Sequence, residues 1–238
     1  MPQFIHHGQQ KKKYVKQMFN DISKTYDLIN LLSSLGIDRY WRKKLINKVK
    51  LTSSQSLLDV ATGTGDVAFG FLKKYNPEVV GMDIAKNMIN IANEKSKKYS
   101  QKNISFIEGD AENIKFEDLK FDALTISFGF RNLGSYDKAL SEFHRVLKIG
   151  GKIAILEFSK PTSKWFAPIF KFYFNKIIPM LGRFLSNKEA YMYLPESVDY
   201  FLTRDDVCSK LKEAGFKNVS YNDYTFGVAT IYLGDKVE

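Results

Sequence analysis

Short clusters of β-branched and other apolar residues alternate along the chain with longer amphipathic stretches. The short clusters fit buried strands, and the longer stretches carry apolar residues at helical spacing. This alternation is typical of repeated strand–helix–strand units around a parallel sheet. The pattern predicts strands at Ser56–Ala61, Glu78–Met82, Ile104–Glu108, Phe121–Ser127 and Gly151–Glu157, and helices at Thr64–Lys74, Ala85–Lys98 and Ser135–Lys148.

The rhythm changes after the fifth predicted strand, where a long aromatic and basic segment begins. The chain then ends in a predicted helix at Arg204–Ala214 and two strands at Lys217–Asp223 and Val228–Leu233. A short turn near Gly227 joins these two strands, so they must pair antiparallel. The sequence therefore predicts an α/β fold with a seven-stranded, mostly parallel sheet that ends in a C-terminal antiparallel hairpin.

Helical patterns also precede the first strand, over more residues than a linker needs. We expect residues 1–50 to form a helical cap that belongs to the same domain as residues 51–238. A length of 238 residues with 44% hydrophobic content agrees with one large domain. The single cysteine, Cys208, excludes an internal disulfide, and residues 1–8 lack the apolar core of a secretory signal. The sequence therefore predicts a cytoplasmic protein.

The formal net charge of +10 fits an anionic partner, either nucleic acid or a phospholipid surface. The lysines are scattered along the chain, so ordinary solvated charge explains the excess equally well. The segment Trp165–Phe174 combines aromatic side chains with lysines, which is typical of a lid that meets a prenyl tail or the bilayer interface. Ordinary packing against the sheet is the alternative for this segment.

The most informative stretch runs from Leu57 to Asp66, where a buried strand passes through a glycine-rich turn into a helix. Gly63 and Gly65 let the backbone turn sharply and approach a ligand where a Cβ atom would clash. With Ala68 in the third place, the stretch also satisfies the dinucleotide pattern Gly-x-Gly-x-x-Gly/Ala. The glycines alone therefore leave NAD open as the ligand.

Acidic residues end three successive predicted strands: Asp59, Asp83 and Asp110. Asp83 is placed to accept hydrogen bonds from ribose hydroxyls, and Asp110 suits an adenine amino group. Three carboxylates repel a diphosphate and favour a ligand that carries a sulfonium and an ammonium. Any one of them could be a helix cap or a turn residue, but together they favour S-adenosyl-L-methionine over a dinucleotide.

At these residues the chain resembles the Rossmann-like class I methyltransferases that use S-adenosyl-L-methionine. The resemblance is closer still to the C-methyltransferase family of ubiquinone and menaquinone biosynthesis. The motifs that carry it, in a match from about Lys12 to Lys236, are Met18–Asp27, Gly36–Arg42, Ser127–Asn132, Leu156–Pro161 and Tyr193–Ser197. Thr62, where many members carry glycine, and Asp110, where some carry asparagine, depart from the pattern without abolishing the expected contacts.

The resemblance implies methyl transfer from S-adenosyl-L-methionine to a ring carbon of a prenylated quinol, which converts demethylmenaquinol to menaquinol. It also implies donor contacts at Thr64, Asp83, Asp110, Ala111 and Ser127. The strand end and the turn add Asp59, Gly63 and Gly65 to the expected cofactor site. No ligand spacing typical of a metal site is visible in the sequence.

Acceptor chemistry is expected in the loop after the fourth strand, at the carboxyl edge of the sheet. A quinol must lose a phenolic proton, with a pKa of about 10, before its ring carbon becomes nucleophilic. Arg131 could stabilise the anion or hold a water that takes the proton, or it could pair with a neighbouring carboxylate. Asn132 could orient the ring oxygen or cap the next helix. We expect Phe128 and Tyr193 on the substrate side, and a packing role for His144 in its amphipathic helix.

Other functions share parts of this pattern. A nucleic-acid methyltransferase would suit the charge, but Ser127–Phe130 stands where amino-directed base methyltransferases carry an Asn/Asp-Pro-Pro-aromatic loop. A dehydrogenase lacks support because no Tyr-x-x-x-Lys pair follows the fourth strand, and a non-catalytic lipid-surface protein would not need the acids. We therefore expect a prenylated quinol substrate, peripheral contact with the inner face of the cytoplasmic membrane and no nucleic-acid partner. A homodimer is compatible with the sequence.

Overall fold

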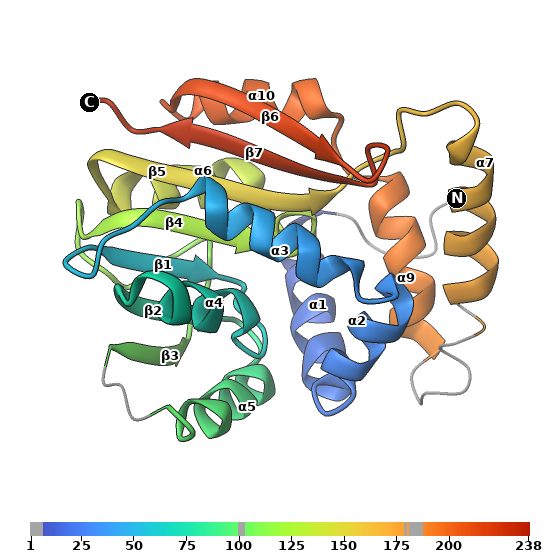
Figure 1. Cartoon of the computed structure of the whole chain (residues 1–238), viewed down its shortest axis with the longest axis horizontal. Coiled ribbons are helices and arrows are strands. Elements are labelled where there is room, and N and C mark those ends of the chain that lie inside the picture. Colours follow the sequence, from blue (N-terminus) through green and yellow to red (C-terminus); the bar gives the residue numbers. More distant parts are fainter. Residues whose placement is uncertain (1–6, 100–102, 179, 181–187) are drawn as a thin grey trace.

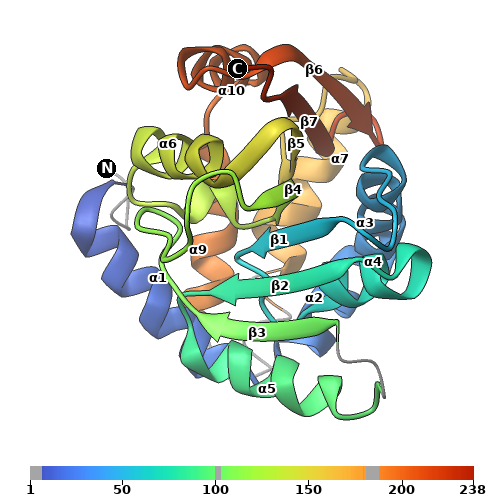
Figure 2. The same ribbon diagram turned by 90° about the vertical axis from the view of Figure 1, so that its left-hand side faces the viewer.

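The computed structural model describes residues 7–99, 103–178, 180 and 188–238. Residues 1–6, which hold most of the polar start of the chain, lie outside the described residues. The strands form one seven-stranded sheet in the order β3-β2-β1-β4-β5-β7-β6 (Figures 1 and 2). Their bounds are β1 (Ser56–Val60), β2 (Glu78–Asp83), β3 (Ile104–Glu108), β4 (Phe121–Ser127), β5 (Leu147–Phe158), β6 (Lys217–Tyr224) and β7 (Ala229–Asp235). The predicted sheet is therefore confirmed.

The five strands β1 to β5 pair in parallel, and β7 runs antiparallel between β5 and β6. This arrangement confirms the predicted C-terminal hairpin. The chain moves outward from β1 to β3 and then returns to β4 on the other side of β1, so the strand order reverses between β1 and β4. Parallel sheets bind ligands beside the carboxyl ends of their strands at such a reversal.

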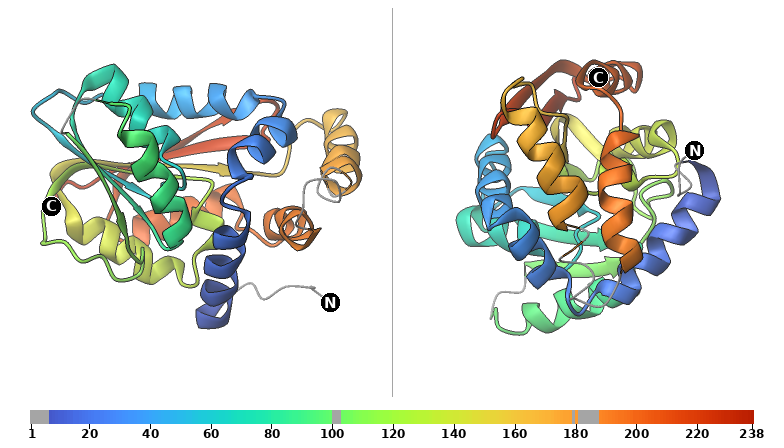
Figure 3. Two further views of the ribbon diagram at one scale, coloured as in Figure 1. Left: turned by 90° about the horizontal axis from the view of Figure 1, so that it is seen from below. Right: turned by 90° about the vertical axis from the view of Figure 1, so that its right-hand side faces the viewer.

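Helices cover both faces of the sheet (Figure 3). One face carries α3 (Ile37–Lys48), α4 (Asp66–Tyr75) and α5 (Lys86–Ser96). The other face carries α6 (Tyr136–Val146) and α10 (Arg204–Glu213). The sheet therefore lies between two helical layers, as an α/β fold requires.

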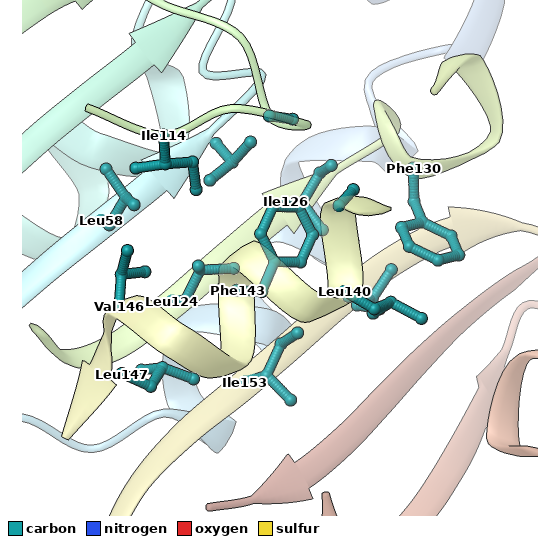
Figure 4. Close-up of a cluster of buried hydrophobic side chains, with 14 of the residues drawn as sticks. Leu58, Ile114, Leu124, Ile126, Phe130, Leu140, Phe143, Val146, Leu147 and Ile153 are labelled. Atoms are coloured by element: carbon teal, nitrogen blue, oxygen red, sulfur yellow. The ribbon is translucent and has the colours of Figure 1, made fainter. Parts of the chain in front are cut away.

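The spacing of apolar residues along α6 explains how this helix packs. Leu140, Phe143 and Val146 recur at helical intervals and are fully buried. They lie against the strand residues Leu124 and Ile153 in one hydrophobic cluster (Figure 4). Burying a side chain of this size stabilises the fold by about 1.5–3 kcal/mol. This packing fixes the strands, and their carboxyl ends in turn support the site.

Helices that precede β1 and helices that follow β5 lie beyond the carboxyl ends of the parallel strands (Figure 1 and the right-hand view of Figure 3). They are α1 (Gly8–Ile22), α2 (Tyr26–Ser34), α7 (Phe166–Phe172), the π-helical turn η2 (Tyr173–Ile177) and α9 (Lys188–Asp199). Val15 and Met18 of α1 pack against Tyr193 of α9. Among the described residues, no helix combines the length and the apolar character that crossing a membrane requires.

Candidate active site

A narrow cavity of about 70 Å³ lies at the carboxyl ends of β1, β2, β3 and β4. The loops after these strands and the N-terminal helix α1 form its walls. The predicted site residues that line it are Gly63, Asp83, Asp110, Ala111, Ser127, Phe128 and Asn132. We call it the donor cavity. The structure thus brings residues from several strand ends together, and their contact with a methyl donor stays a prediction.

Asp83 fastens the turn between β1 and α4. Gly63 has a φ of +57°, a conformation that favours glycine, and its N–H donates to Asp83 Oδ2 at 2.9 Å. Asp83 Oδ1 accepts the N–H of Ala85 at 2.8 Å. Burial raises the pKa of Asp83, although these backbone hydrogen bonds act in the opposite direction. The carboxylate borders the donor cavity and keeps acceptor capacity for a ligand.

Asp59 lies behind the turn rather than in the cavity wall. Its two carboxylate oxygens accept hydrogen bonds from the Thr62 hydroxyl at 2.6 Å and from the Thr125 hydroxyl at 2.7 Å. Burial raises the pKa of Asp59 to about 6. In this structure Asp59 ties the end of β1 to β4, and its direct contact with a donor stays a prediction.

Thr64 and Gly65 also lie outside the cavity wall. The Thr64 hydroxyl donates to Asp27 Oδ1 at 2.6 Å and accepts from Lys95 Nζ at 2.9 Å. These contacts connect the turn to α2, which carries Asp27, and to α5, which carries Lys95. Gly65 has a φ of +91° and supplies the sharp bend before α4. Donor contacts of both residues remain predictions.

Lys12 of α1 lines the same cavity, a position that the sequence pattern did not predict. Its Nζ lies 2.8 Å from Asp110 Oδ2 and 2.9 Å from Glu112 Oε2. Asp110 Oδ1 also accepts the N–H of Glu112 at 2.9 Å. The side of the cavity formed by Asp110 and the buried Ala111 is thus closed by a cation from a helix far away in the sequence.

The loop after β4 has two features that independently indicate a ligand-binding site. Ser127 Oγ is buried and makes no hydrogen bond within the described residues, and such an orphaned group is costly unless a ligand or water satisfies it. The next residue, Phe128, has a φ of +59°, which strains a bulky side chain. Together with the nearby acids, these features fit the polar, cationic methyl donor that the sequence predicts.

A second cavity of about 300 Å³ adjoins the first and is mostly apolar. Its walls come from α1, α2, α3, α7, η2, α9 and the ends of the sheet. The aromatic residues that line it are Phe19, Tyr26, Trp41, Phe128, Phe158, Phe166, Phe170, Tyr173, Phe174 and Tyr193. We call it the acceptor cavity. Phe19, Tyr26 and Phe128 also line the donor cavity, so the two cavities meet at these residues.

Arg131 brings a buried positive charge to the acceptor cavity. It lies in the 3₁₀ turn η1 (Phe130–Asn132), and its Nη1 donates to Glu157 Oε1 and to the Phe128 carbonyl, each at 2.6 Å. Its Nε donates to Ser197 Oγ at 3.2 Å. Nη2 makes no hydrogen bond within the described part of the chain. The predicted ion pair therefore exists, and it leaves one guanidinium nitrogen available to a ligand.

Asn132 and Tyr193 connect the two cavities. Tyr193 lines the acceptor cavity, and its hydroxyl donates to Asn132 Oδ1 at 3.0 Å. Asn132 lines the donor cavity, and its amide nitrogen lies 3.4 Å from the Phe128 carbonyl. The helix-cap alternative for Asn132 is wrong, because Ser135 caps α6 by accepting the N–H of Lys138.

The remaining candidate residues lie away from both cavities. His144 of α6 packs edge-on against Phe216, with ring centroids 5.1 Å apart, and lines neither cavity. Cys208 of α10 is partly buried against the hydrophobic core. Both positions agree with packing roles.

Known proteins are similar to this chain in sequence or in fold. The ubiE/COQ5 methyltransferase family matches residues 7–236. The chain is 44% identical over 230 residues to the ubiquinone/menaquinone biosynthesis C-methyltransferase UbiE of Geobacter sp. strain M21, covering 95% of this chain and 98% of that protein. It is 43% identical over 222 residues to the demethylmenaquinone methyltransferase of Thermus thermophilus, covering 92% and 100%. A crystal structure of a SAM-dependent methyltransferase from Aquifex aeolicus has the same fold, with a TM-score of 0.60 and 20% identity over 82% of this chain and 89% of that one. The chain therefore belongs to the ubiE/COQ5 methyltransferase family.

Proposed function

We propose that the protein transfers a methyl group from S-adenosyl-L-methionine to a ring carbon of demethylmenaquinol, giving menaquinol. The observation that carries this proposal is the apolar acceptor cavity of about 300 Å³, which shares Phe19, Tyr26 and Phe128 with the donor cavity. A prenylated ring needs an apolar site beside the donor, whereas a nucleic acid needs an exposed basic one. The names of both relatives support the same substrate class.

The donor cavity would hold the cofactor through the residues at the strand ends. S-adenosyl-L-methionine supplies, when bound, a methyl group on a positively charged sulfur. Asp83 would accept ribose hydroxyls, Asp110 with Ala111 would receive the adenine, and the unpartnered Ser127 Oγ would hydrogen bond to the ligand. Nearby carboxylates favour a cationic ligand electrostatically.

Arg131 would act on the acceptor. A phenolic hydroxyl with a pKa of about 10 is mostly protonated at neutral pH, so the ring needs help to become nucleophilic. The Arg131 guanidinium lies in an apolar cavity, where a positive charge stabilises a quinolate oxygen more strongly than it would in water. Its free Nη2 could bind that oxygen or hold a water that takes the proton. Asn132 and Tyr193 would then orient the ring between the cavities.

Quinone profiling tests the substrate. A bacterial host that lacks its own quinone C-methyltransferase would express this chain, the Asp83→Ala variant or an empty vector, and its quinones would be measured by mass spectrometry. We expect menaquinone to return only with the unaltered chain. Accumulated demethylmenaquinone in all three strains, with the protein present and folded, would contradict the proposed substrate.

We also propose that the mouth of the acceptor cavity contacts the inner face of the cytoplasmic membrane. Leu35, Ile37 and Ile169 line this cavity and are exposed at the same time, so they form an apolar rim. Trp165, which precedes α7, and Phe172, the last residue of α7, are 64% and 63% exposed. Large exposed apolar side chains at the entrance of a lipophilic site favour contact with lipid, through which a prenyl tail can enter.

Vesicle flotation tests this surface. At low salt we expect the protein to float with anionic vesicles, and the double variant Trp165→Ser/Phe172→Ser to remain mostly soluble. Tyr221→Ser, which alters an exposed aromatic residue on the edge strand β6, is the matched control and should float normally. Equal soluble recovery of all three proteins with neutral and anionic vesicles would contradict membrane contact. A homodimer stays a prediction.

A further inference from the structure

The backbone of Arg131 is held on both sides by charged side chains. Its N–H donates to Glu157 Oε2 at 3.0 Å, and its carbonyl accepts from Lys11 Nζ at 2.6 Å. The Tyr136 hydroxyl donates to the same carbonyl over a longer distance of 3.3 Å. Lys11 therefore makes the shorter of two contacts that fix the peptide group after Arg131.

Lys11 does not line either cavity, and it is not a surface lysine. Only 2% of its surface is exposed, although its neighbour Lys13 on α1 is exposed. Its Nζ lies 5.6 Å from the centre of the Tyr136 ring, which adds a cation–π contact. The residue thus reaches from α1 through the interior to the loop after β4.

The placement of a second buried cation beside Arg131 is unfavourable by itself. Burial, and then the charge of Arg131, lower the pKa of Lys11 to about 8, whereas Glu157 and Glu112 act in the opposite direction. An apolar side chain would fill the same volume without this penalty. Buried charges that work against stability are concentrated at functional sites. The contact with the Arg131 carbonyl places this buried charge beside the loop that carries Arg131.

We propose that Lys11 is a positioning residue, which directs the Arg131 guanidinium into the acceptor cavity by holding the Arg131 carbonyl. Arg131 lies in a 3₁₀ helix of a single turn, where hydrogen-bond geometry is poorer than in an α-helix. An additional hydrogen bond to its carbonyl therefore helps to fix the position of its backbone. A displacement of a reacting group by about 1 Å can lower turnover by ~10²-fold. This inference rests on the proposed role of Arg131 in the chemical step.

The alternative is that Lys11 only fastens α1 to the rest of the molecule. Other contacts already do so: the N–H of Gly8 donates to the Gly134 carbonyl at 3.0 Å, and Lys12 pairs with Asp110 and Glu112. A fastening role predicts weaker donor binding when Lys11 is lost, since α1 lines the donor cavity. A positioning role predicts slower turnover at unchanged donor affinity.

Turnover and donor affinity of single and double variants separate these roles. The assay uses full-length protein, S-adenosyl-L-methionine and a short-chain demethylmenaquinol, with affinity for S-adenosylhomocysteine measured by calorimetry. Lys11→Met should lower kcat about 10-fold, leave the donor Kd within about twofold and not lower Tm. Lys11→Gln, which keeps an N–H donor, should recover part of the loss. Lys13→Met, the same change at an exposed site on α1, should match the unaltered protein.

The double variant decides whether Lys11 acts through Arg131. If it does, adding Lys11→Met to the Arg131→Lys variant should lower kcat by less than about twofold, because the effects of coupled residues on turnover are not additive. A further 10-fold loss in that background, a weakened donor Kd or full activity of Lys11→Met would overturn the proposal. Should Lys11→Met not fold, Lys11→Gln carries the same comparison. Full activity of Arg131→Lys alone would instead refute the role of Arg131, and the role of Lys11 with it.

Discussion

The donor and acceptor cavities are neighbours, but they are built in different ways. The donor cavity is narrow, about 70 Å³, and its predicted residues follow the ends of successive strands. The acceptor cavity is about 300 Å³, and helices from both ends of the chain form it. The first depends on acids and sharp turns, whereas the second depends on aromatic packing beside the buried Arg131 guanidinium.

This difference explains how one fold can keep its donor and change its acceptor. Strand ends in a parallel sheet are fixed by the packing of the sheet itself, so residues such as Asp83 and Asp110 need no distant segment to bring them together. The acceptor side exists only when α1, α2, α7 and α9 assemble beyond those strand ends (Figure 1). We therefore expect variants on the two sides to fail in different measurements.

The largest expected effect is on stability and lies on the acceptor side. Glu157 is fully buried and pairs with Arg131 at 2.6 Å. Glu157→Leu leaves the Arg131 charge unpaired, so the free energy of unfolding should fall by about 3–5 kcal/mol in denaturant titrations. Glu94→Ala is the control, because Glu94 and Lys97 form an exposed pair on α5 and its loss should change stability by less than about 0.5 kcal/mol. Equal, small losses in both variants would refute the importance of the buried pair.

On the donor side, Asp59 should make stability depend on pH. Its pKa is about 6 when folded, above the ordinary value of 3.8, so the folded protein keeps a proton that the unfolded chain releases. The buried Asp59 carboxyl therefore lowers the free energy of unfolding by about 3 kcal/mol as pH rises from about 4 to 6. Asp59→Asn has no such titration, so its stability relative to the parent should improve over that window.

Urea unfolding at a series of pH values measures the difference in the free energy of unfolding between Asp59→Asn and the parent. Asp122→Asn gives the control of opposite sign, since hydrogen bonds from Lys148 and Ser56 outweigh burial and lower the pKa of Asp122. Its stabilising contribution is present at neutral pH and is lost as pH falls through the folded pKa. If the Asp59→Asn difference does not change with pH, the carboxyl of Asp59 titrates normally and its burial has no electrostatic consequence.

A somewhat smaller effect is expected on donor binding. Asp83→Ala removes the proposed ribose acceptor and should weaken S-adenosylhomocysteine binding by about 1.5–3 kcal/mol, the range for charge-assisted hydrogen bonds. Calorimetric titration gives the dissociation constant directly. Because Asp83 also holds the Gly63 N–H, the variant must first be shown to be folded. An unchanged dissociation constant in a folded variant would remove Asp83 from the site.

The sequence predicted the sheet well because its strands are continuous apolar runs. The largest boundary error is at β5, which begins at Leu147, although the pattern predicted a helix through Lys148 and a strand from Gly151. Leu147 pairs with Phe121 across a register shift, and Gly150 has a φ of +81°, so tertiary pairing extends the strand into residues that the pattern assigned to the end of the helix and its connection. Local pattern cannot show such a pairing.

For the same reason, the sequence predicted which residues lie together better on the donor side than on the acceptor side. The donor cavity residues follow strand ends, so their order along the chain already suggested their proximity. Tyr26, Trp41 and Lys12 were not predicted as site residues, because their roles arise only when helices far apart in the sequence meet. The run of lysines at the start of α1 resembled ordinary surface charge, yet Lys11 is buried against the Arg131 loop.

The division of work between the two cavities is tested most directly by Arg131→Lys, which keeps the charge and loses the planar fork of donors. The measurement is kcat together with the dissociation constant for S-adenosylhomocysteine, on the same folded preparation. We predict that kcat falls by about 10²-fold, the scale of one lost proton-transfer or oxyanion contact, while the dissociation constant stays within about twofold. A matching loss of donor affinity, or a Tm well below that of the parent, would show that Arg131 is structural and would contradict its assignment to the acceptor.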